Sequence, residues 1–370
     1  LTSETGAGSI ADVASQLVGL HATDPTTPFL SLWARMPGFE VADLEGALYR
    51  DRSVVKHLAM RRTLWVLTAG DLSAVQAAAS DRVAANERKR LIADVQKAGI
   101  ATDGAKWLGH ASKAVLAHVH EHGPTSAREL RTALSELAGA HDPAPGKRWG
   151  GATPVAPRVL TVLAVEGFLV RGPNDGTWTT SRPRWASASA WLGAAGDPTA
   201  AEAARALVIR AWLHAFGPAT VNDVKWWFGN TLTWARDGLR DVGAVEVDLH
   251  GTPGVALPDD LEPVAETAPW CALLPGLDVT TMGWQDRDWY LGEYRGQVFD
   301  TNGNAGPTAW CDGRVVGGWR QDADGRVVLQ LLENVGAKAS KVLARKADEL
   351  TDWLGGVRIN PRFPSPLSKA

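Results

Sequence analysis

An internal repeat constrains what this chain of 370 residues can fold into more than its composition does. Residues 114–130 (AVLAHVHEHGPTSAREL) match residues 207–224 (LVIRAWLHAFGPATVNDV), and their Gly-Pro pairs begin at Gly123 and Gly217, 94 residues apart (217 − 123). In each copy an apolar helix is predicted to end at the glycine, because glycine and proline terminate helices. A Ser or Thr three residues later, with an acidic residue three positions further on, forms a capping box for a second helix. Each copy therefore predicts a helix-turn-helix.

The residues after each copy predict a third helix and a two-stranded β wing, which together complete a winged helix. After the first copy these are a helix at 154–164 and strands at 167–171 and 177–179. After the second copy they are a helix at 231–242 and strands at 244–249 and 255–257. The chain before the repeat shows the same order, with helices at 10–20, 27–36 and 43–49, strands at 54–58 and 63–67, and a helical stretch at 70–100. Three tandem winged helices are a stronger indication of fold than one.

The last hundred residues predict β structure instead. Short apolar segments and Asp-Gly turns at 312 and 324 are typical of a small β-barrel or a curled sheet. Strands are expected at 270–278, 285–287, 296–300, 307–320 and 326–332, and a terminal helix at 337–354. The predicted fold class is therefore α+β, with three tandem winged-helix domains followed by a small C-terminal β-barrel. The predicted domains are 1–100, 101–190, 191–262 and 263–370.

The composition narrows the class of protein. Hydrophobic residues make up 45% of the chain and charged residues 21%, as in globular proteins. Cys271 and Cys311 are too few for a disulfide framework or a cysteine zinc site, and suit a reducing compartment. The sequence has no apolar run of about 20 residues, and its start, LTSETGAGSI, lacks the regions of a signal peptide. We therefore expect a soluble, cytoplasmic protein without a membrane partner, and the missing initiator methionine predicts a longer natural chain.

Histidines are the only candidates for a metal site. His118, His120 and His122 alternate in the first repeat copy, with His110 and His141 elsewhere in the same predicted domain. Alternate residues of a helix do not share a face, and no carboxylate or cysteine is spaced to complete a site. We therefore predict no metal and no cofactor.

The balance of 38 Lys and Arg against 41 Asp and Glu gives a net charge of −3. This total neither indicates nor excludes a nucleic-acid partner, because the distribution of the cations decides. Among the 17 tryptophans most are expected to pack, and some to stack on bases or line a pocket. The candidate phosphate contacts are Arg61, Arg62, Arg158, Lys225, Arg320, Lys338, Lys341 and Arg345. Spacings of 3, 4 and 7 place the last three on one helical face, and a solvated surface is the alternative interpretation.

Catalysis, if the chain has any, is predicted in the turn between the first two helices, residues 21–27 (HATDPTT). A glycine before this turn and two prolines around it keep the backbone out of helix and make it rigid. His21 and Thr23 lie two residues apart, so in an extended segment their side chains project to the same side. The alternative is that Thr23 or Asp24 caps the next helix while His21 packs or bonds locally.

Several motifs in combination resemble a known family. They are GLHATDPTTPFLSLWAR and MRRTLWVLTAGDL near the start, AFGPATVNDVKWWFG in the second repeat copy, and LLPGLD, DGRVVGGWR and NPRFPSP toward the end. Across nearly its whole length the sequence resembles the bacterial winged-helix DNA-binding proteins that include the AlkZ-like and YcaQ-like DNA glycosylases. The resemblance implies three winged helices and a β-barrel in a C-shaped body that holds duplex DNA on its concave side. It also implies removal of bulky alkylated purines by cleavage of the N-glycosidic bond.

The resemblance places the catalytic pair at His21-Ala22-Thr23, where relatives carry glutamine, an apolar residue, and glutamine or aspartate. Both polar positions of this chain depart from that pattern. A purine alkylated at N7 is cationic and leaves readily, so the enzyme mainly has to place a water at C1′ and stabilise an oxocarbenium-like sugar. His21 is expected to hold that water and Thr23 to anchor it, while Asp24 supplies negative charge unless capping uses it.

Two other functions fit the same sequence. A non-catalytic regulator whose winged helices grip duplex DNA would explain the fold and the altered pair. Such regulators usually dimerise on their sites, whereas three modules in one chain indicate a monomer. A protein that sequesters a genotoxin through its tryptophans would bind that ligand without DNA.

Overall fold

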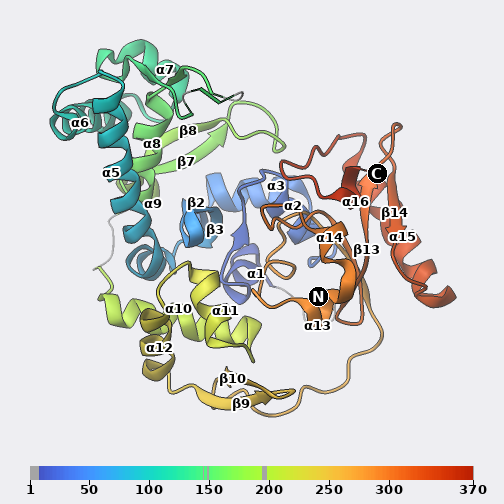
Figure 1. The fold of residues 1–370 in the computed structure, drawn as a ribbon. Helices are drawn as coiled ribbons and strands as arrows, with labels where there is room; N and C mark the ends of the chain where they lie inside the picture. Colours follow the sequence, from blue (N-terminus) through green and yellow to red (C-terminus); the bar gives the residue numbers. More distant parts are fainter. Residues whose placement is uncertain (1–7, 145, 148–149, 194–197, 370) are drawn as a thin grey trace. The chain divides into compact units, whose positions relative to one another are not determined.

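The computed structural model describes residues 8–144, 146–147, 150–193 and 198–369 (Figure 1). The chain divides into two compact units. One contains the N-terminal segment up to Leu44 together with the chain from Ile209 onward, and the other contains Glu45–Val208. Residues 1–7, most of the stretch in which the sequence predicts no signal peptide, lie outside the described part. Among the helices that are described, none has the length and apolar character needed to cross a membrane.

The unit Glu45–Val208 contains the first repeat copy, whose elements follow the predicted order. Its three helices are α6 (Gly104–His122), α7 (Ala127–Ala133) and α8 (Ala156–Val165), and strand β4 (Thr125–Ser126) lies between the first two. Strands β7 (Leu169–Asn174) and β8 (Pro183–Ser187) form the wing, and β8 pairs with β4. The second wing strand lies beyond the predicted 177–179, because the chain there forms a loop closed by a bond from Asn174 Nδ2 to the Thr180 carbonyl.

The core of this unit explains why the apolar helix of the repeat is there. Leu108, Val115 and Val119 lie on one face of α6 and are at most 2% exposed. They pack in one cluster with the buried residues of α8 and with Leu91 and Val95 of α5 (Asp81–Lys97). Burying such side chains stabilises the fold by roughly 1.5–3 kcal/mol each.

The remaining elements of this unit are short. Two strands, β2 (Val54–Leu58) and β3 (Leu64–Thr68), form an antiparallel hairpin close to the predicted strands at 54–58 and 63–67. The others are η1 (Gly46–Arg50), η2 (Met60–Arg62), α4 (Leu72–Val75), η3 (Gln76–Ser80), η4 (Ser135–Leu137), β5 (Ala140–His141), β6 (Thr153–Pro154) and α9 (Ala188–Leu192).

The second repeat copy again has the predicted order. Helix α10 (Ala201–Phe216) crosses the boundary between the units, and α11 (Val221–Phe228), α12 (Leu232–Asp241), β9 (Val245–Leu249) and β10 (Thr252–Ala256) follow it. Gly229 ends α11 in the left-handed conformation at φ 62°, which glycine adopts without strain. Ala219 and Val255 form a β-bridge that ties the turn to the wing. The division of the chain into three winged-helix domains stays a prediction.

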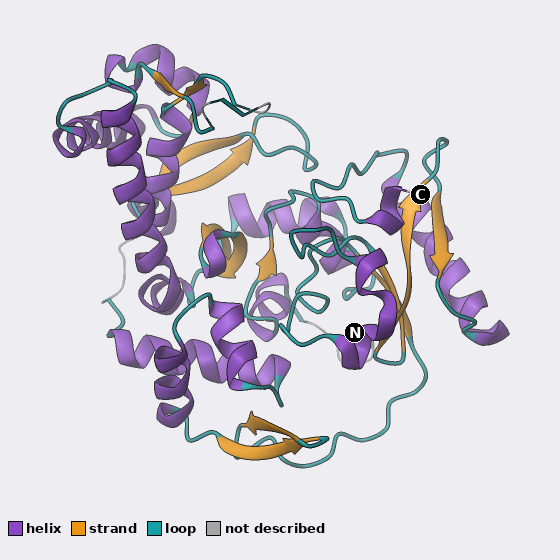
Figure 2. Ribbon diagram, viewed as in Figure 1, coloured by secondary structure: helices purple, strands orange, loops and turns teal. Residues whose placement is uncertain are grey.

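The predicted C-terminal β-barrel is wrong. Strands β11 (Cys271–Leu274), β12 (Thr308–Cys311), β13 (Arg314–Gln321) and β14 (Val327–Leu331) form an antiparallel sheet in that order (Figure 2). Within the described residues this sheet stays open, because its two edge strands do not pair and α15 (Gly336–Leu354) packs against both of them. A disulfide links Cys271 to Cys311 across the first strand pair.

Two of the strands predicted in this region are also wrong. Residues 285–287 form no strand, and 296–300 lie mostly in helix, because the chain there folds into α13 (Asp288–Leu291), η5 (Gly292–Tyr294) and α14 (Arg295–Val298). These short helices bury apolar side chains against the sheet, where the Tyr290 and Trp310 rings stack with centroids 5.2 Å apart. The chain continues past the sheet and α15 to α16 (Pro366–Lys369).

Candidate active site

The predicted catalytic turn lies in the N-terminal segment, between α1 (Ile10–Gln16) and α2 (Thr27–Trp33). Helix α1 ends four residues earlier than predicted, because Val18 and Gly19 adopt positive φ angles of 58° and 117°. The next two residues form the short strand β1 (Leu20–His21), so His21 has the extended backbone that the sequence analysis expected. The last helix of this segment is α3 (Val41–Glu45).

The three predicted site residues differ in exposure. The His21 side chain is buried, with 3% of its surface exposed, and Asp24 is 6% exposed. Thr23 between them is half-buried and offers the most surface of the three. The protein encloses the His21 ring, so the ring can act only on a molecule that comes into direct contact with it.

The Asp24 carboxylate accepts hydrogen bonds at both of its oxygens. Its Oδ1 accepts from the backbone N–H of Thr26 at 3.0 Å and from the Thr26 hydroxyl at 2.7 Å. Its Oδ2 accepts from the backbone N–H of Arg362 at 2.8 Å. This carboxylate therefore closes an Asx turn just before α2, whose N-cap residue is Thr26 and not the Thr23 or Asp24 of the alternative interpretation.

Two distant segments hold the turn from outside. Arg362 donates through Nη1 to the Thr23 carbonyl at 2.9 Å. The Thr27 hydroxyl donates to the Gly276 carbonyl at 2.7 Å. These two partners belong to the NPRFPSP and LLPGLD motifs, so three motifs that are far apart in the sequence meet at one place. Nothing local in residues 21–27 identifies either partner.

A buried ion pair anchors the body of α2. Arg35, just after the helix, donates to both oxygens of Asp278, at 2.9 Å from Nη1 and 2.7 Å from Nη2. The Ser31 hydroxyl donates to the same carboxylate at 2.6 Å. Burial alone would raise the pKa of Asp278, but the charge of Arg35 and these hydrogen bonds lower it below its usual range. The sequence does not predict this pair, because its members lie 243 residues apart.

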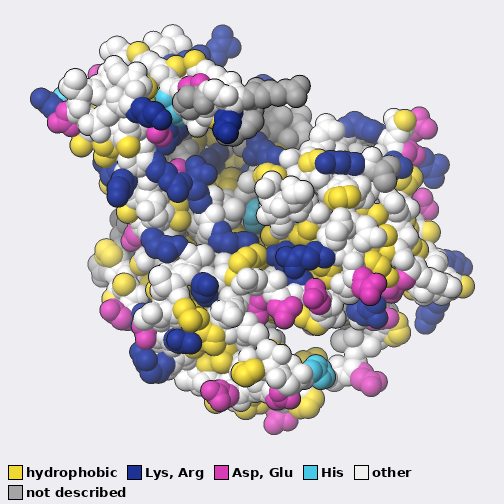
Figure 3. All heavy atoms as spheres, in the orientation of Figure 1, with side chains coloured by type: hydrophobic (Ala, Val, Ile, Leu, Met, Phe, Trp, Pro, Cys, Tyr) yellow, Lys and Arg dark blue, Asp and Glu magenta, His cyan; other side chains and the backbone are white. Residues whose placement is uncertain are grey.

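The candidate phosphate contacts fall into two groups. Arg62 pairs with Glu87 at 2.8 Å, Arg158 with Asp94 at 2.5 Å, and Arg345 with Glu349 at 3.4 Å. Lys225, Lys338 and Lys341 are exposed, Arg320 is half-buried, and Arg61 adopts a positive φ of 53° in the turn between β2 and β3. In Figure 3 dark blue Lys and Arg side chains lie over the region of α5, a helix that carries Arg88, Lys89 and Arg90.

Lys56 and His57 are buried titratable residues that were not predicted from the sequence. Burial lowers the pKa of Lys56 in β2 to about 8, and the charge of Arg171 acts in the same direction. Burial also lowers the pKa of the adjacent His57 to about 4, and its Nε2 lies 3.1 Å from the Ser80 hydroxyl. The available signal was a Lys-His pair inside an otherwise apolar strand, VVKHL.

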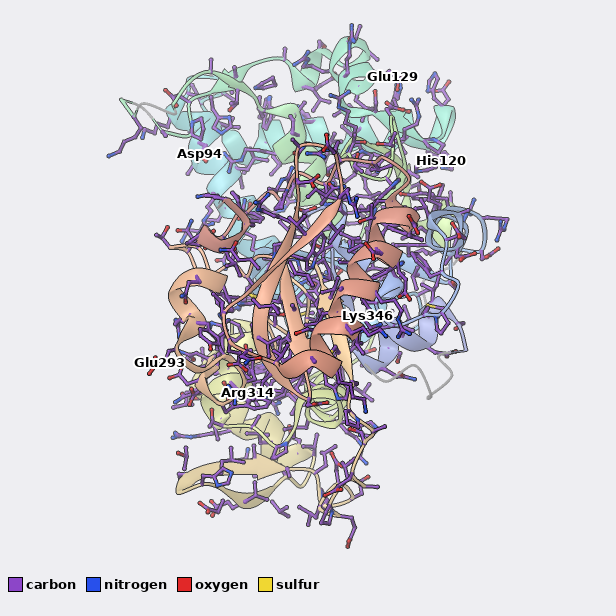
Figure 4. The ribbon with its side chains drawn as sticks, turned by 90° about the vertical axis from the view of Figure 1, so that its right-hand side faces the viewer. Asp94, His120, Glu129, Glu293, Arg314 and Lys346 are labelled. Atoms are coloured by element: carbon purple, nitrogen blue, oxygen red, sulfur yellow. A yellow bond between two sulfur atoms is a disulfide. The ribbon has the colours of Figure 1, made fainter. Side chains whose placement is uncertain are left out.

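A cavity of about 370 Å³ lies beyond the other end of α2. Its lining includes Trp33, Phe39 and Trp353, with Lys346 and Glu349 from α15, and Figure 4 labels Lys346 on that helix. The Trp353 ring nitrogen donates to the Phe39 carbonyl at 2.8 Å, which fixes one wall. The described lining does not include His21 or Thr23, so this cavity is separate from the turn.

The fold and the turn are those of a known protein family. The model of the family described as "DNA glycosylase AlkZ-like" matches residues 14–353, so the chain belongs to the AlkZ-like DNA glycosylase family. This confirms the family to which the motifs pointed.

This chain is similar to a curated sequence and to a solved structure, both from Streptomyces sahachiroi. The "Interstrand DNA cross-link repair glycosylase" is 34% identical over 171 residues, which span 44% of this chain and 45% of that relative. The chain therefore matches less than half the length of this curated relative. The solved structure of the "Streptomyces sahachiroi DNA glycosylase AlkZ" is similar with a TM-score of 0.73 and 22% identity, over 97% of this chain and 95% of that chain. At this identity the likeness shows the fold.

Proposed function

We propose that this protein is a DNA glycosylase that hydrolyses the N-glycosidic bond of bulky, N7-alkylated purines in duplex DNA. The observation that carries the proposal is the family match over residues 14–353, which includes the turn where the resemblance places the catalytic pair. The protein would act as a monomer, without metal or cofactor, in repair or in self-resistance to a genotoxin. An open DNA groove suits bulky adducts, because they resist burial in an enclosed base-flipping pocket.

The protein has to supply few catalytic groups, because the alkylated base is already a good leaving group. Alkylation at N7 makes the purine cationic, so the C1′–N9 bond breaks with its electron pair leaving on the base. A water oxygen then bonds to C1′ of the oxocarbenium-like sugar and loses a proton. His21 would hold this water and accept its proton, and Thr23 would be the second polar anchor. The products are a free alkylated base and an abasic sugar.

The contacts around the turn support positioning roles for its neighbours. Asp24 is hydrogen-bonded to Thr26 and to the Arg362 backbone, so we assign it to holding the turn and not to stabilising the sugar. The Arg35–Asp278 pair fixes α2, which begins at the end of this turn. Precise placement of a water is worth orders of magnitude in rate, and rigid anchoring of this kind would provide it.

His21→Ala tests the proposal directly. We expect it to lower the single-turnover rate of 7-methylguanine release from a duplex at least about 100-fold, as is typical for loss of a general base. Binding to the same duplex should stay within a few-fold. His21→Gln restores the side chain usual at this position in the family, and we expect it to retain excision. Rates come from quantifying released base, and binding from fluorescence anisotropy.

The burial of His21 requires a control for folding. The melting temperature of each variant shows whether His21→Ala fails only because the protein unfolds. Excision by a folded His21→Ala variant at the wild-type rate would contradict the proposed role. Loss of excision in both variants, with normal melting temperatures, would mean that glutamine cannot replace the imidazole.

A non-catalytic duplex-binding protein is the second candidate function. It is favoured by the departure of His21 and Thr23 from the family pair and by the 3% exposure of His21. The two functions differ in one product. After incubation with a duplex that contains one 7-methylguanine, a glycosylase leaves an abasic site that alkali cleaves, whereas a binder leaves the strand intact.

A further inference from the structure

We propose that Arg362 forms a binding site for a backbone phosphate of DNA directly beside the candidate catalytic turn. This inference rests on the proposed function only for the identity of the ligand as duplex DNA. Arg362 was not among the eight cations that the sequence analysis selected, because nothing in NPRFPSP indicates where the segment lies in the fold.

Arg362 is anchored to the turn through both its backbone and its side chain. Its backbone N–H donates to Asp24 at 2.8 Å, and its side chain donates through Nη1 to the Thr23 carbonyl at 2.9 Å. A guanidinium has five N–H donors, and this is the one side-chain bond that the structure gives it among the described residues. Because the side chain is exposed, the remaining donors are available to an anion.

The segment around Arg362 is held in place by contacts on both sides of the arginine. The Gln321 side chain donates to the Val357 carbonyl at 3.0 Å and accepts from the Ile359 N–H at 2.8 Å. Beyond Arg362, buried Ser365 lies so close to Gly306 that a Cβ there would collide with it. We call residues 357–367 the C-terminal strap. A fixed strap lowers the conformational entropy lost when Arg362 binds a ligand.

The charge of Arg362 also favours an anionic ligand at this place. A guanidinium beside a turn at which a sugar develops positive charge would oppose the reaction if it stayed uncompensated. Asp24 accepts its hydrogen bonds from the Arg362 backbone N–H and from Thr26, so among the described contacts no side-chain ion pair with Asp24 neutralises the guanidinium. A phosphate of the nucleotide under attack lies close to its sugar, matches the guanidinium fork, and would cancel the charge. The bond to Thr23 would then link phosphate position to the geometry of the turn.

The test compares Arg362→Gln and Arg362→Lys with Arg358→Gln. Arg358 is an exposed arginine of the same strap, four residues earlier, and is the matched control. Binding of a 20-base-pair unmodified duplex is measured by fluorescence anisotropy between 50 and 200 mM salt. We expect Arg362→Gln to reduce the slope of log K against log salt by about 1, the effect of losing one phosphate contact. Arg362→Lys should keep the slope, and Arg358→Gln should leave it unchanged.

Excision by the same variants separates this inference from the proposed function. If the wild type excises 7-methylguanine, Arg362→Gln should slow single-turnover excision more than it weakens binding, and Arg362→Lys should recover part of the rate. A wild type that binds but never excises would overturn the proposed function and leave the phosphate site standing on the salt slope. An unchanged slope for Arg362→Gln, or an equal drop for Arg358→Gln, would overturn the phosphate site whatever the excision rate. Melting temperatures of all variants show whether a changed slope reflects a lost phosphate contact or an unfolded protein.

Discussion

Asp278 holds a negative charge in the interior, and its partner is almost as well buried. The side chains of Asp278 and Arg35 are 0% and 7% exposed. We expect Asp278→Asn to lower stability at pH 7 by about 3–5 kcal/mol, because it leaves a buried arginine without its counter-charge. Urea unfolding monitored by tryptophan fluorescence measures this loss of stability as a lower midpoint. Asp237→Asn is the control, since Asp237 pairs with Arg240 on an exposed helical surface and should cost less than about 1 kcal/mol.

The same pair predicts a pH dependence. The folded-state pKa of Asp278 is below its usual value, so the stability that it contributes is present above the unfolded pKa of about 3.9 and is lost as pH falls through the folded pKa. The difference in free energy of unfolding between the wild type and Asp278→Asn should therefore become smaller in acid. A gap that stays constant from pH 7 to pH 3 would mean that the carboxylate does not titrate with folding.

At this scale the sequence predicted only what is local. His21 and Thr23 were found because a glycine and two prolines mark a turn around them. Arg35, Asp278 and Arg362 carry contacts that are 243 residues apart or more, and no periodicity or spacing predicts such pairs. Charged residues with a partner in the distant chain look like ordinary surface charges in a sequence.

Both repeat copies have the capping box, but its acidic residue is exposed in the first copy and buried in the second. In the first copy Glu129 closes the box while exposed, and Arg184 bonds to it. In the second copy Asp223 is buried, and its other oxygen accepts the backbone N–H groups of Gln285 and Asp286 at 2.7 and 3.1 Å. One carboxylate therefore caps α11 and also fixes the loop before α13.

This difference gives a prediction for which the repeat supplies its own control. Asp223→Asn removes one of the two acceptor oxygens of a buried carboxylate that bonds both the α11 cap and the loop before α13, and we expect a loss of about 1–3 kcal/mol. Glu129→Gln should cost less than about 1 kcal/mol, because its partners are exposed. Thermal unfolding of both variants measures the difference. Equal shifts in melting temperature would show that the loop contact adds nothing to the cap.

Elements were predicted well where their signals are local. Gly-Pro pairs and capping boxes predicted the helix-turn-helix of both repeat copies, and the third helices α8 and α12 lie within two residues of the predicted 154–164 and 231–242. The barrel failed because closure depends on whether β11 and β14 pair, and the edge contacts of α15 decide that. The strand predicted at 296–300 failed because its apolar residues, Val298 and Phe299, are buried by a helix packing on the sheet.

For the whole molecule, the proposed binding to DNA has to overcome a net charge of −3. Local cations must therefore supply the attraction, and affinity for a duplex should depend strongly on salt. Even three phosphate contacts give a slope near −2.7, or about a 40-fold loss of affinity between 50 and 200 mM salt. Anisotropy of an unmodified duplex measures it. Affinity that is indifferent to salt would contradict DNA as the partner, and the family assignment would still stand on its match.

The anchoring of Asp24 by Arg362 sets an order of events during synthesis. The two residues are separated by 338 positions, so at 5–20 residues per second the turn waits roughly 20–70 seconds for its partner to be translated. A nascent chain, or a product of premature termination, would carry His21 and Thr23 without the clasp that shapes their backbone. If the protein is the proposed glycosylase, an incomplete polypeptide would therefore lack the backbone geometry on which excision depends.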